Sequence, residues 1–489
     1  MAAEIKHITD FPDKVNPMVV KELRQGLRGV SFVILFIAIQ AALALILLTT
    51  AAAASYENAG NLISRIIFFF FSVAVLVIQP LRGIPALSSE IKGNTIDLLC
   101  LTRLSAWRIA FGKWVSIISQ SALILTAIIP YLILRYFFGD MQLFAEILMM
   151  FTVFLISCAF TAFTVGMSGT NSIVLRVLVP LAGAVLVFGM IWGGLVEEGR
   201  HIYPEFVQMF GLYETSDKLV YLGFAVGCIY TTWMLLDLGT SMIAPIAENR
   251  ATMRRAVSLA LIVITLLAFY FGEVPHEGAI IIGIMLCLPV SIISLTENPQ
   301  LVPPVVAPFV RKGILGKIAG RFLYPGWASG LIFTLMLYGL LHGIIFLYEL
   351  NGAHVDHEFI VTLNSIFATC FMSLALTRFL AGKREYRFAL FLLFGIAQFL
   401  IVIIIFAVEE FTHGLHIIHY FCWIPTSFIQ LLDNNHFSED AITNLSYGLL
   451  GFYALLAATT TGSSWKHMAS TEKSLTEPDA APDPAPPVI

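Results

Sequence analysis

Long apolar runs recur along the whole chain and are separated by short polar segments. A membrane-spanning helix needs about 20 mostly apolar residues, and about twelve runs approach that length. The pattern therefore predicts an all-α, polytopic integral membrane protein with about twelve transmembrane helices. The runs at 256–272 and 278–295 are the shortest and also fit a re-entrant pair. The twelve runs are 30–54, 62–81, 114–137, 143–168, 173–194, 219–245, 256–272, 278–295, 327–348, 359–378, 388–408 and 444–463.

The composition supports the same class. The 489 residues are 58% hydrophobic and only 12% charged, whereas soluble domains carry about 25% charged residues. The first apolar run is too long for a cleavable signal sequence, so we expect it to be an uncleaved first span. None of the six cysteines forms a CxxC pair, and we expect neither a disulfide framework nor a bound metal. We expect no nucleic-acid partner.

The basic residues predict the orientation. If the N-terminus is cytoplasmic, the cytoplasmic segments hold 24 of the 28 Lys and Arg residues. The other side holds only Arg65, Arg135, Arg200 and Lys218. This bias fits the positive-inside rule and places both termini in the cytoplasm. We expect the chain to lie in the plasma (inner) membrane of a bacterium, in contact with membrane lipid.

The segment 88–113, SSEIKGNTIDLLCLTRLSAWRIAFGK, joins the second and third runs on the predicted cytoplasmic side. Gly93 and Asn94 suit a left-handed turn. Thr95 can then cap a short helix with Asp97 in its first turn, and Ser105 can cap the helix of the third span. An apolar patch rimmed by charge indicates a partner contact, although the same helix also fits a position among lipid headgroups.

Residues 16–28, NPMVVKELRQGLR, precede the first run. Pro17 suits the first position of a helix. Apolar and charged residues then alternate in a way that predicts an amphipathic elbow helix. The alternative is a basic flank that only orients the first span.

Together the two segments resemble the permeases of ABC-2 type transporters. The first is similar to the N-terminal signature NP-x-x-x-KELR-x-x-x-R, and the second to the loop E-x-x-x-GT-x-[ED]-LL-x-x-TPLS-x-x-x-I-x-x-GK that follows span two. The resemblance covers the first six spans, to about residue 250. Asn94 departs from the family's Gly and Arg103 from its Pro. The matching residues are Asn16, Pro17, Lys21, Glu22, Leu23, Arg24 and Arg28, and then Glu90, Thr95, Asp97, Leu98, Leu99, Thr102, Leu104, Ser105, Ile109, Gly112 and Lys113.

The resemblance implies that the loop after span two is a coupling helix that docks on a cytoplasmic ABC ATPase. The chain itself has no GxxxxGK[ST] motif and no cytoplasmic segment long enough for a nucleotide-binding domain. We therefore expect this chain to bind no cofactor and not to be an enzyme, with ATP and Mg²⁺ used by the partner subunit. The coupling residues would be Glu90, Gly93, Asn94, Thr95, Asp97, Leu98, Leu99, Thr102 and Arg103.

Three other features are candidates for chemistry. His413, His416 and His419 follow Glu409 and Glu410, but their spacing drifts around a helix and fits an interfacial aromatic belt better than a metal site. The deepest acid, Asp237, lies either on a transport path or in a structural pair, for example with Arg176. The Pro-rich basic segment 296–325 fits either a second docking loop or a linker.

These observations predict a function for the protein and a division of the chain into four parts. We expect the permease subunit of an ABC transporter, more plausibly an exporter, working as an internal pseudo-dimer or as a homodimer. Two alternatives stay open: a membrane enzyme acting on lipid-linked substrates, and a non-transporting subunit of an ABC complex. The expected parts are an N-terminal segment with the elbow (1–28), a six-helix core (29–250) with coupling loop 82–113, a second helical set (251–463) and a disordered cytoplasmic tail (464–489).

Overall fold

A computed structural model of the chain describes most of it. Structural statements below refer to these described residues: 17–52, 59–93, 105–136, 142–170, 172–196, 210–243, 249–297, 301–381, 387–412, 421, 423–428 and 438–476.

The described residues form helices and no strands. Eleven helices are long and apolar enough to cross a membrane, in agreement with the predicted all-α polytopic class. The run predicted at 173–194 is also helical, with Val174–Gly189 counted as a shorter apolar helix. By contacts the chain forms two compact units, Met1–Pro245 and Ile246–Ile489.

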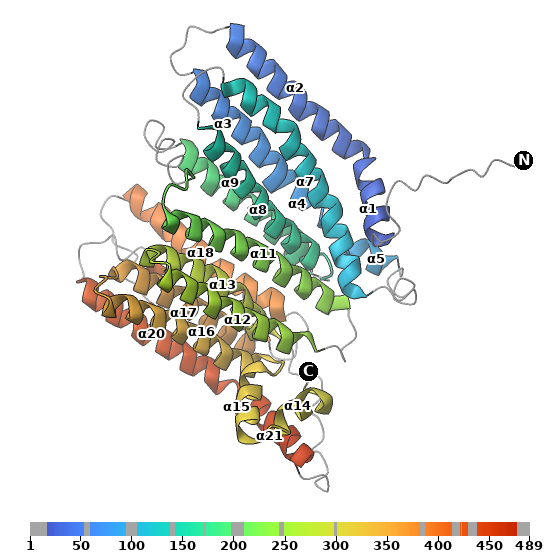
Figure 1. The fold of residues 1–489 in the computed structure, drawn as a ribbon. Coiled ribbons are helices and arrows are strands. Elements are labelled where there is room, and N and C mark those ends of the chain that lie inside the picture. The colour runs from blue at the N-terminus through green and yellow to red at the C-terminus, as the bar shows by residue number, and fades with distance from the viewer. Residues whose placement is uncertain are drawn as a thin grey trace, which may run out of the picture. The chain divides into compact units, whose positions relative to one another are not determined.

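The first unit is an antiparallel bundle preceded by a short helix (Figure 1). Its core is rich in aromatic and branched side chains, among them Phe68, Phe71 and Leu76. Long apolar helices bury part of this surface against each other and leave the rest for lipid. The helices are α1 (Pro17–Leu27), α2 (Val30–Ala52), α3 (Ala59–Ser72), α4 (Gln79–Leu81), α5 (Ser88–Lys92), α7 (Ala106–Tyr136), α8 (Leu143–Met167), α9 (Val179–Val196) and α11 (Thr215–Ile243).

Two π-helical turns interrupt the first unit: η1 (Val73–Ile78) between α3 and α4, and η2 (Val174–Leu178) before α9. After η1 comes Pro80, which has no N–H to donate. The Ser157 hydroxyl of α8 donates to the Val75 carbonyl at 2.7 Å. A neighbouring helix thus supplies a hydrogen bond where the backbone pattern changes.

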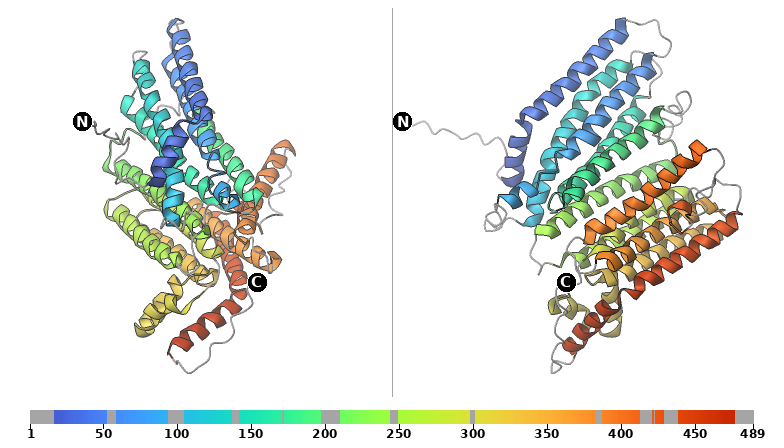
Figure 2. Two further views of the ribbon diagram at one scale, coloured as in Figure 1. Left: turned by 90° about the vertical axis from the view of Figure 1, so that its right-hand side faces the viewer. Right: turned by 180° about the vertical axis from the view of Figure 1, so that it is seen from behind.

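The described part of the second unit contains six long apolar helices: α12 (Arg250–Phe271), α13 (His276–Thr296), α16 (Trp327–Leu350), α17 (His357–Ala381), α18 (Arg387–Thr412) and α20 (Glu439–Thr459). Both α12 and α13 are long and apolar enough to cross a membrane, so their length favours two full spans over the re-entrant alternative. Three shorter helices, α14 (Pro303–Val310), α15 (Gly313–Leu323) and α21 (Gly462–Thr476), lie together beyond one end of these long helices (Figures 1 and 2).

The expectation of a disordered tail from residue 464 was wrong for its first part. Helix α21 runs to Thr476, and Trp465, Met468 and Leu475 pack into a cluster with Leu301, Val306 and Tyr324. The apolar residues recur at three- and seven-residue intervals, which places them on one face of a helix. The acidic Pro-Ala-rich end, 477–489, lies outside the described residues.

Candidate functional site

The predicted elbow exists as α1, which packs along the start of α7. Met18 and Val19 are buried, and Met18 forms a cluster with Leu87 and Ile109. A Cβ added to Gly112 would lie 3.0 Å from the Met18 side chain, so the glycine of the GK pair allows this close approach. Asn16 lies outside the described residues.

Lys113 joins the two segments that carry the sequence resemblance. Its Nζ lies 3.2 Å from Glu22 Oε1 on α1 and 3.0 Å from Glu90 Oε1 on α5. The three side chains are only 8%, 16% and 15% exposed. One cation therefore forms ion pairs with two largely buried carboxylates, and we call Glu22, Glu90 and Lys113 the Lys113 cluster.

Hydrogen bonds beside the Lys113 cluster fix the same helices. The Ser116 hydroxyl donates to the Glu22 backbone carbonyl at 2.8 Å. Arg82 donates to Gln120 of α7 and, at 3.3 Å, to Gln79. Burial lowers the pKa of the Arg82 guanidinium. The elbow, the end of the second span and the start of the third are thus locked together.

Only two of the predicted coupling residues, Glu90 and Gly93, are among the described residues. Gly93 ends α5 with φ −79°, so the expected left-handed turn does not occur at Gly93. Asn94, Thr95, Asp97, Leu98, Leu99, Thr102 and Arg103 lie outside the described residues. Beyond them, the Arg108 N–H donates to Ser105 Oγ at 3.4 Å, which confirms Ser105 as the cap of α7.

On the elbow, the residue types predicted as site residues separate by face. Lys21, Arg24 and Arg28 are exposed, whereas Glu22 points to Lys113. An exposed basic edge beside an inward-facing carboxylate is the amphipathic arrangement that the sequence predicted.

Asp237 is buried in α11, with 4% of its surface exposed. Its Oδ1 accepts a hydrogen bond from Thr240 at 3.4 Å. Next to it, α11 and α8 approach closely: a Cβ on Gly239 would lie 2.7 Å from the Gly166 Cα. Asp237 therefore sits in a tightly packed helix pair.

The second unit has its own buried charge cluster, which we call the Arg255 cluster: Arg254, Arg255 and Glu297. The Glu297 carboxylate, at the end of α13, forms ion pairs with the guanidinium groups of Arg254, at 3.1 Å, and Arg255, at 2.6 Å. Arg255 is fully buried and also donates to three backbone carbonyls and one hydroxyl, those of Phe322, Tyr324, Gly326 and Ser329.

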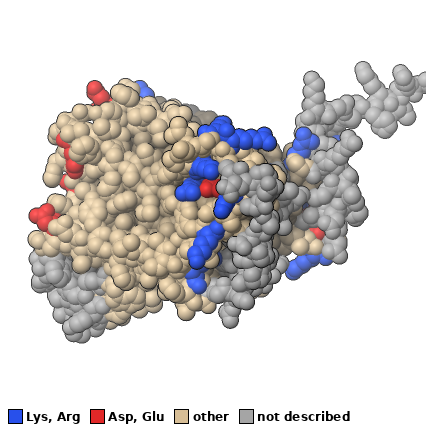
Figure 3. Space-filling view, turned by 90° about the horizontal axis from the view of Figure 1, so that it is seen from below, with Lys and Arg blue, Asp and Glu red and all other residues tan. Residues whose placement is uncertain are grey.

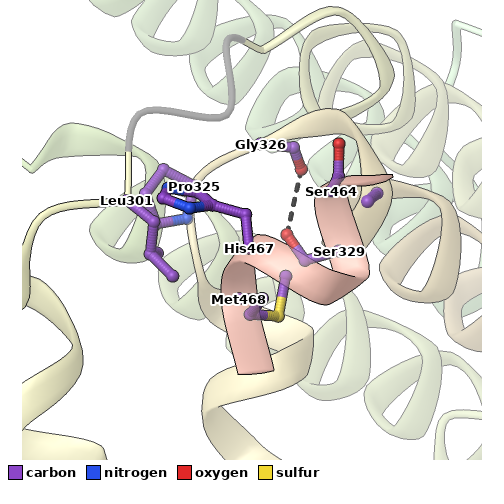
Figure 4. Close-up of a pocket in the computed structure, with 8 residues that line it drawn as sticks. Leu301, Pro325, Gly326, Ser329, Ser464, His467 and Met468 are labelled. Atoms are coloured by element: carbon purple, nitrogen blue, oxygen red, sulfur yellow. Dashed lines mark hydrogen bonds between the residues drawn. The ribbon is translucent and has the colours of Figure 1, made fainter. Parts of the chain in front are cut away.

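A hollow lies between the turn before α16 and α21. It has an interior volume of about 10 Å³, enough for about one water molecule. Ser329 donates to the Gly326 carbonyl at its edge, as Figure 4 shows. Its size excludes it as a substrate pocket. The lining residues are Leu301, Pro325, Gly326, Ala328, Ser329, Ser464, His467 and Met468.

The histidines at 413, 416 and 419 lie outside the described residues. Within the described part of the chain, no group of three or more His, Cys, Asp or Glu side chains is arranged to hold a metal ion.

Sequence reasoning missed the paired charges of both clusters. Lys113 was recognised only as a position in a motif, and its two carboxylate partners lie 91 and 23 residues away in the chain. Their positions in the sequence could have indicated the pairing. Lys113, Arg254 and Arg255 each lie within the first turns of a long apolar helix, where a charged side chain needs a partner.

Comparison with family models, with curated proteins and with solved structures gives no match. The resemblance to ABC-2 permeases therefore depends on the two local segments and on where they lie in the chain.

Proposed function

We propose that this protein is the membrane-embedded permease subunit of an ATP-driven ABC transporter of the ABC-2 type, working as an exporter. In this proposal a separate cytoplasmic ATPase docks on the segment between α5 and α7. The motion of that ATPase on binding ATP then reaches the membrane helices.

The observation that carries the proposal is the Lys113 cluster. Two motifs that resemble the permease signature converge in space through three of their own residues, Glu22, Glu90 and Lys113. Motif matches that arise by chance have no reason to share a buried salt bridge. The ion pairs support the resemblance, because they connect the elbow to the helices at both ends of the proposed docking segment.

The same contacts suggest a mechanism. The docking segment begins after α5 and ends at Ser105, before α7. Glu90 and Lys113 join these two helices at 3.0 Å, so displacement of the segment moves α5 and α7 as one body. Glu22 adds α1, which leads directly into the first span. A push on the docking segment is therefore shared by the first three spans.

Co-purification tests the proposal. The full chain is isolated from native membranes in a mild detergent, and the bound proteins are identified by mass spectrometry. A P-loop ATPase should accompany the native chain. It should be lost when Asp97, Leu98 and Leu99 are all changed to Ala, because these residues stand in the proposed docking helix.

The control changes Lys466, an exposed residue on α21 in the predicted cytoplasmic tail, to Ala, and should retain the ATPase. Absence of any ATPase with the native chain, under conditions that preserve other ABC complexes, contradicts the proposal. An ATPase that binds while no substrate moves in reconstituted vesicles would instead identify a non-transporting subunit.

A further inference from the structure

Helix α15 presents a bare apolar face that its own unit leaves uncovered. Ile314, Leu315 and Ile318 are 79%, 81% and 51% exposed. With 100° between successive residues, these three positions and Phe322 fall on one side of the helix. Gly316 and Gly320 fall on the other side and are buried. A soluble surface rarely presents large aliphatic side chains in such a group.

The opposite face holds α15 firmly in place. A Cβ on Gly316 would lie 2.1 Å from the Phe309 carbonyl oxygen, and a Cβ on Gly320 2.4 Å from the Tyr324 ring. The Tyr324 ring packs edge-on against Phe309, with centroids 5.4 Å apart. Burial first, and then the nearby Glu472 carboxylate, raises the pKa of the Tyr324 phenol to about 12. The glycines thus allow α15 to lie directly on α14 and on the turn into α16.

Ion pairs and backbone hydrogen bonds complete the anchoring. Arg321 pairs with Glu472 of α21 at 3.0 Å. Thr252 of α12 donates to the Leu323 carbonyl at 2.9 Å, and Arg255 donates to the Phe322 carbonyl at 3.1 Å. These contacts orient α15 so that its own unit does not bury the apolar face.

The charged residues of the segment that carries this face have one sign. Residues 301–325 contain four basic residues, Arg311, Lys312, Lys317 and Arg321, and no Asp or Glu. Arg311 and Lys312 are exposed just before α15 begins. Figure 3 shows exposed Lys and Arg side chains, in blue, on the face seen from below. Basic residues beside an apolar stripe are typical of helices that lie in a membrane interface.

The position of α15 along the chain sets its depth. It ends at Leu323, and the apolar helix α16 begins at Trp327. A helix joined to a span by so few residues lies at the level where that span leaves the hydrocarbon.

From these observations we propose that α15 lies in the headgroup layer and binds anionic phospholipids. Ile314, Leu315 and Ile318 enter the acyl boundary, and Arg311, Lys312 and Lys317 contact the phosphate groups. The sequence had left this segment as a docking loop or a linker, and this assignment is independent of whether an ATPase binds the chain.

Spin-label accessibility tests the proposal on the full chain. Cysteines are placed at Ile314 or Ile318, in a background with Cys100 and Cys422 changed to Ser, because the other four native cysteines are buried. The protein is reconstituted in vesicles of phosphatidylcholine with or without phosphatidylglycerol. Labels at both positions should be accessible to oxygen and protected from a water-soluble nickel chelate. A label at Lys466, an exposed position on α21, is the solvent reference.

Charge dependence separates anionic-lipid binding from simple apolar insertion. Protection from the nickel chelate should rise severalfold with phosphatidylglycerol, and the rise should disappear when Arg311, Lys312 and Lys317 are changed to Gln. Nickel access equal to that of the Lys466 reference in every vesicle overturns the proposal. So does protection from both reagents, which would mean that protein covers the face, and so does insertion that is equal in both lipids.

Discussion

At the scale of single residues, each unit groups buried charges at one end of its long helices into a cluster of three. Lys113 forms ion pairs with two carboxylates, and Glu297 forms ion pairs with two guanidinium groups. Burying a charge is costly unless it is paired, so removal of one member of a cluster weakens the pairing of the charges that remain. These clusters are therefore the positions where a single substitution has its largest effect.

We expect Lys113→Met to destabilise the first unit by about 3–5 kcal/mol, the usual cost of breaking a buried ion pair. Thermal unfolding in detergent, compared with the native chain, measures the loss. Lys21→Met is the matched control, since Lys21 is exposed on α1 and should change stability little.

A triple variant checks the cause. If Glu22→Gln and Glu90→Gln are added to Lys113→Met, no buried charge is left without a partner, and part of the stability should return. If the triple variant is less stable than Lys113→Met, the uncompensated charge of the buried carboxylates is not the source of the loss.

At the scale of helices, close approach is set by glycines. In the second unit, a Cβ on Gly330 of α16 would lie 2.1 Å from the Ser294 carbonyl oxygen of α13. The obstacle is backbone, which cannot rotate away. Small residues at helix contacts are the common means of packing within a membrane.

Gly330→Ala should therefore destabilise the second unit, by about 1–3 kcal/mol as for other overpacked sites. Gly343→Ala is the control on the same helix, because nothing lies within 4 Å of its added Cβ. That change should be neutral or stabilising by about 0.5–1 kcal/mol. Equal effects of the two substitutions in thermal unfolding would show that the α13–α16 contact is not tight.

The helices also show what a sequence can predict. Long apolar runs revealed the spans, because a span is defined by length and composition alone. The elbow α1 was predicted from Pro17 and its alternating pattern. Helices α14, α15 and α21 were missed as helices, because their stability comes from residues distant in the chain, such as Arg321 with Glu472. The partners of Lys113 and Arg255 were missed for the same reason.

At the scale of the whole molecule, the chain forms two compact units that meet in sequence at Pro245 and Ile246. The predicted boundary was at residue 250. Each unit has its own buried charge cluster and its own buried cysteines, Cys158 and Cys228 in the first and Cys287 and Cys370 in the second.

We expect residues 1–245 and 246–489 to fold as separate chains. In a background with Cys100 and Cys422 changed to Ser, a thiol-reactive dye should label each half only above a cooperative thermal transition, because the remaining cysteines are buried. Labelling of a half at low temperature, while the full chain stays unlabelled, would show that the halves depend on each other.

The Lys113 cluster also has a consequence for how the protein is made. Glu22 leaves the ribosome before its partner, which follows 91 residues later. At ordinary synthesis rates this is a wait of roughly 5 to 18 seconds. During that time the elbow carries a carboxylate without its lysine, and two apolar helices enter the membrane. Helix α1 can therefore pair with α7 only after Lys113 has been synthesised. A ribosome stalled before residue 113 would leave Glu22 without this ion pair.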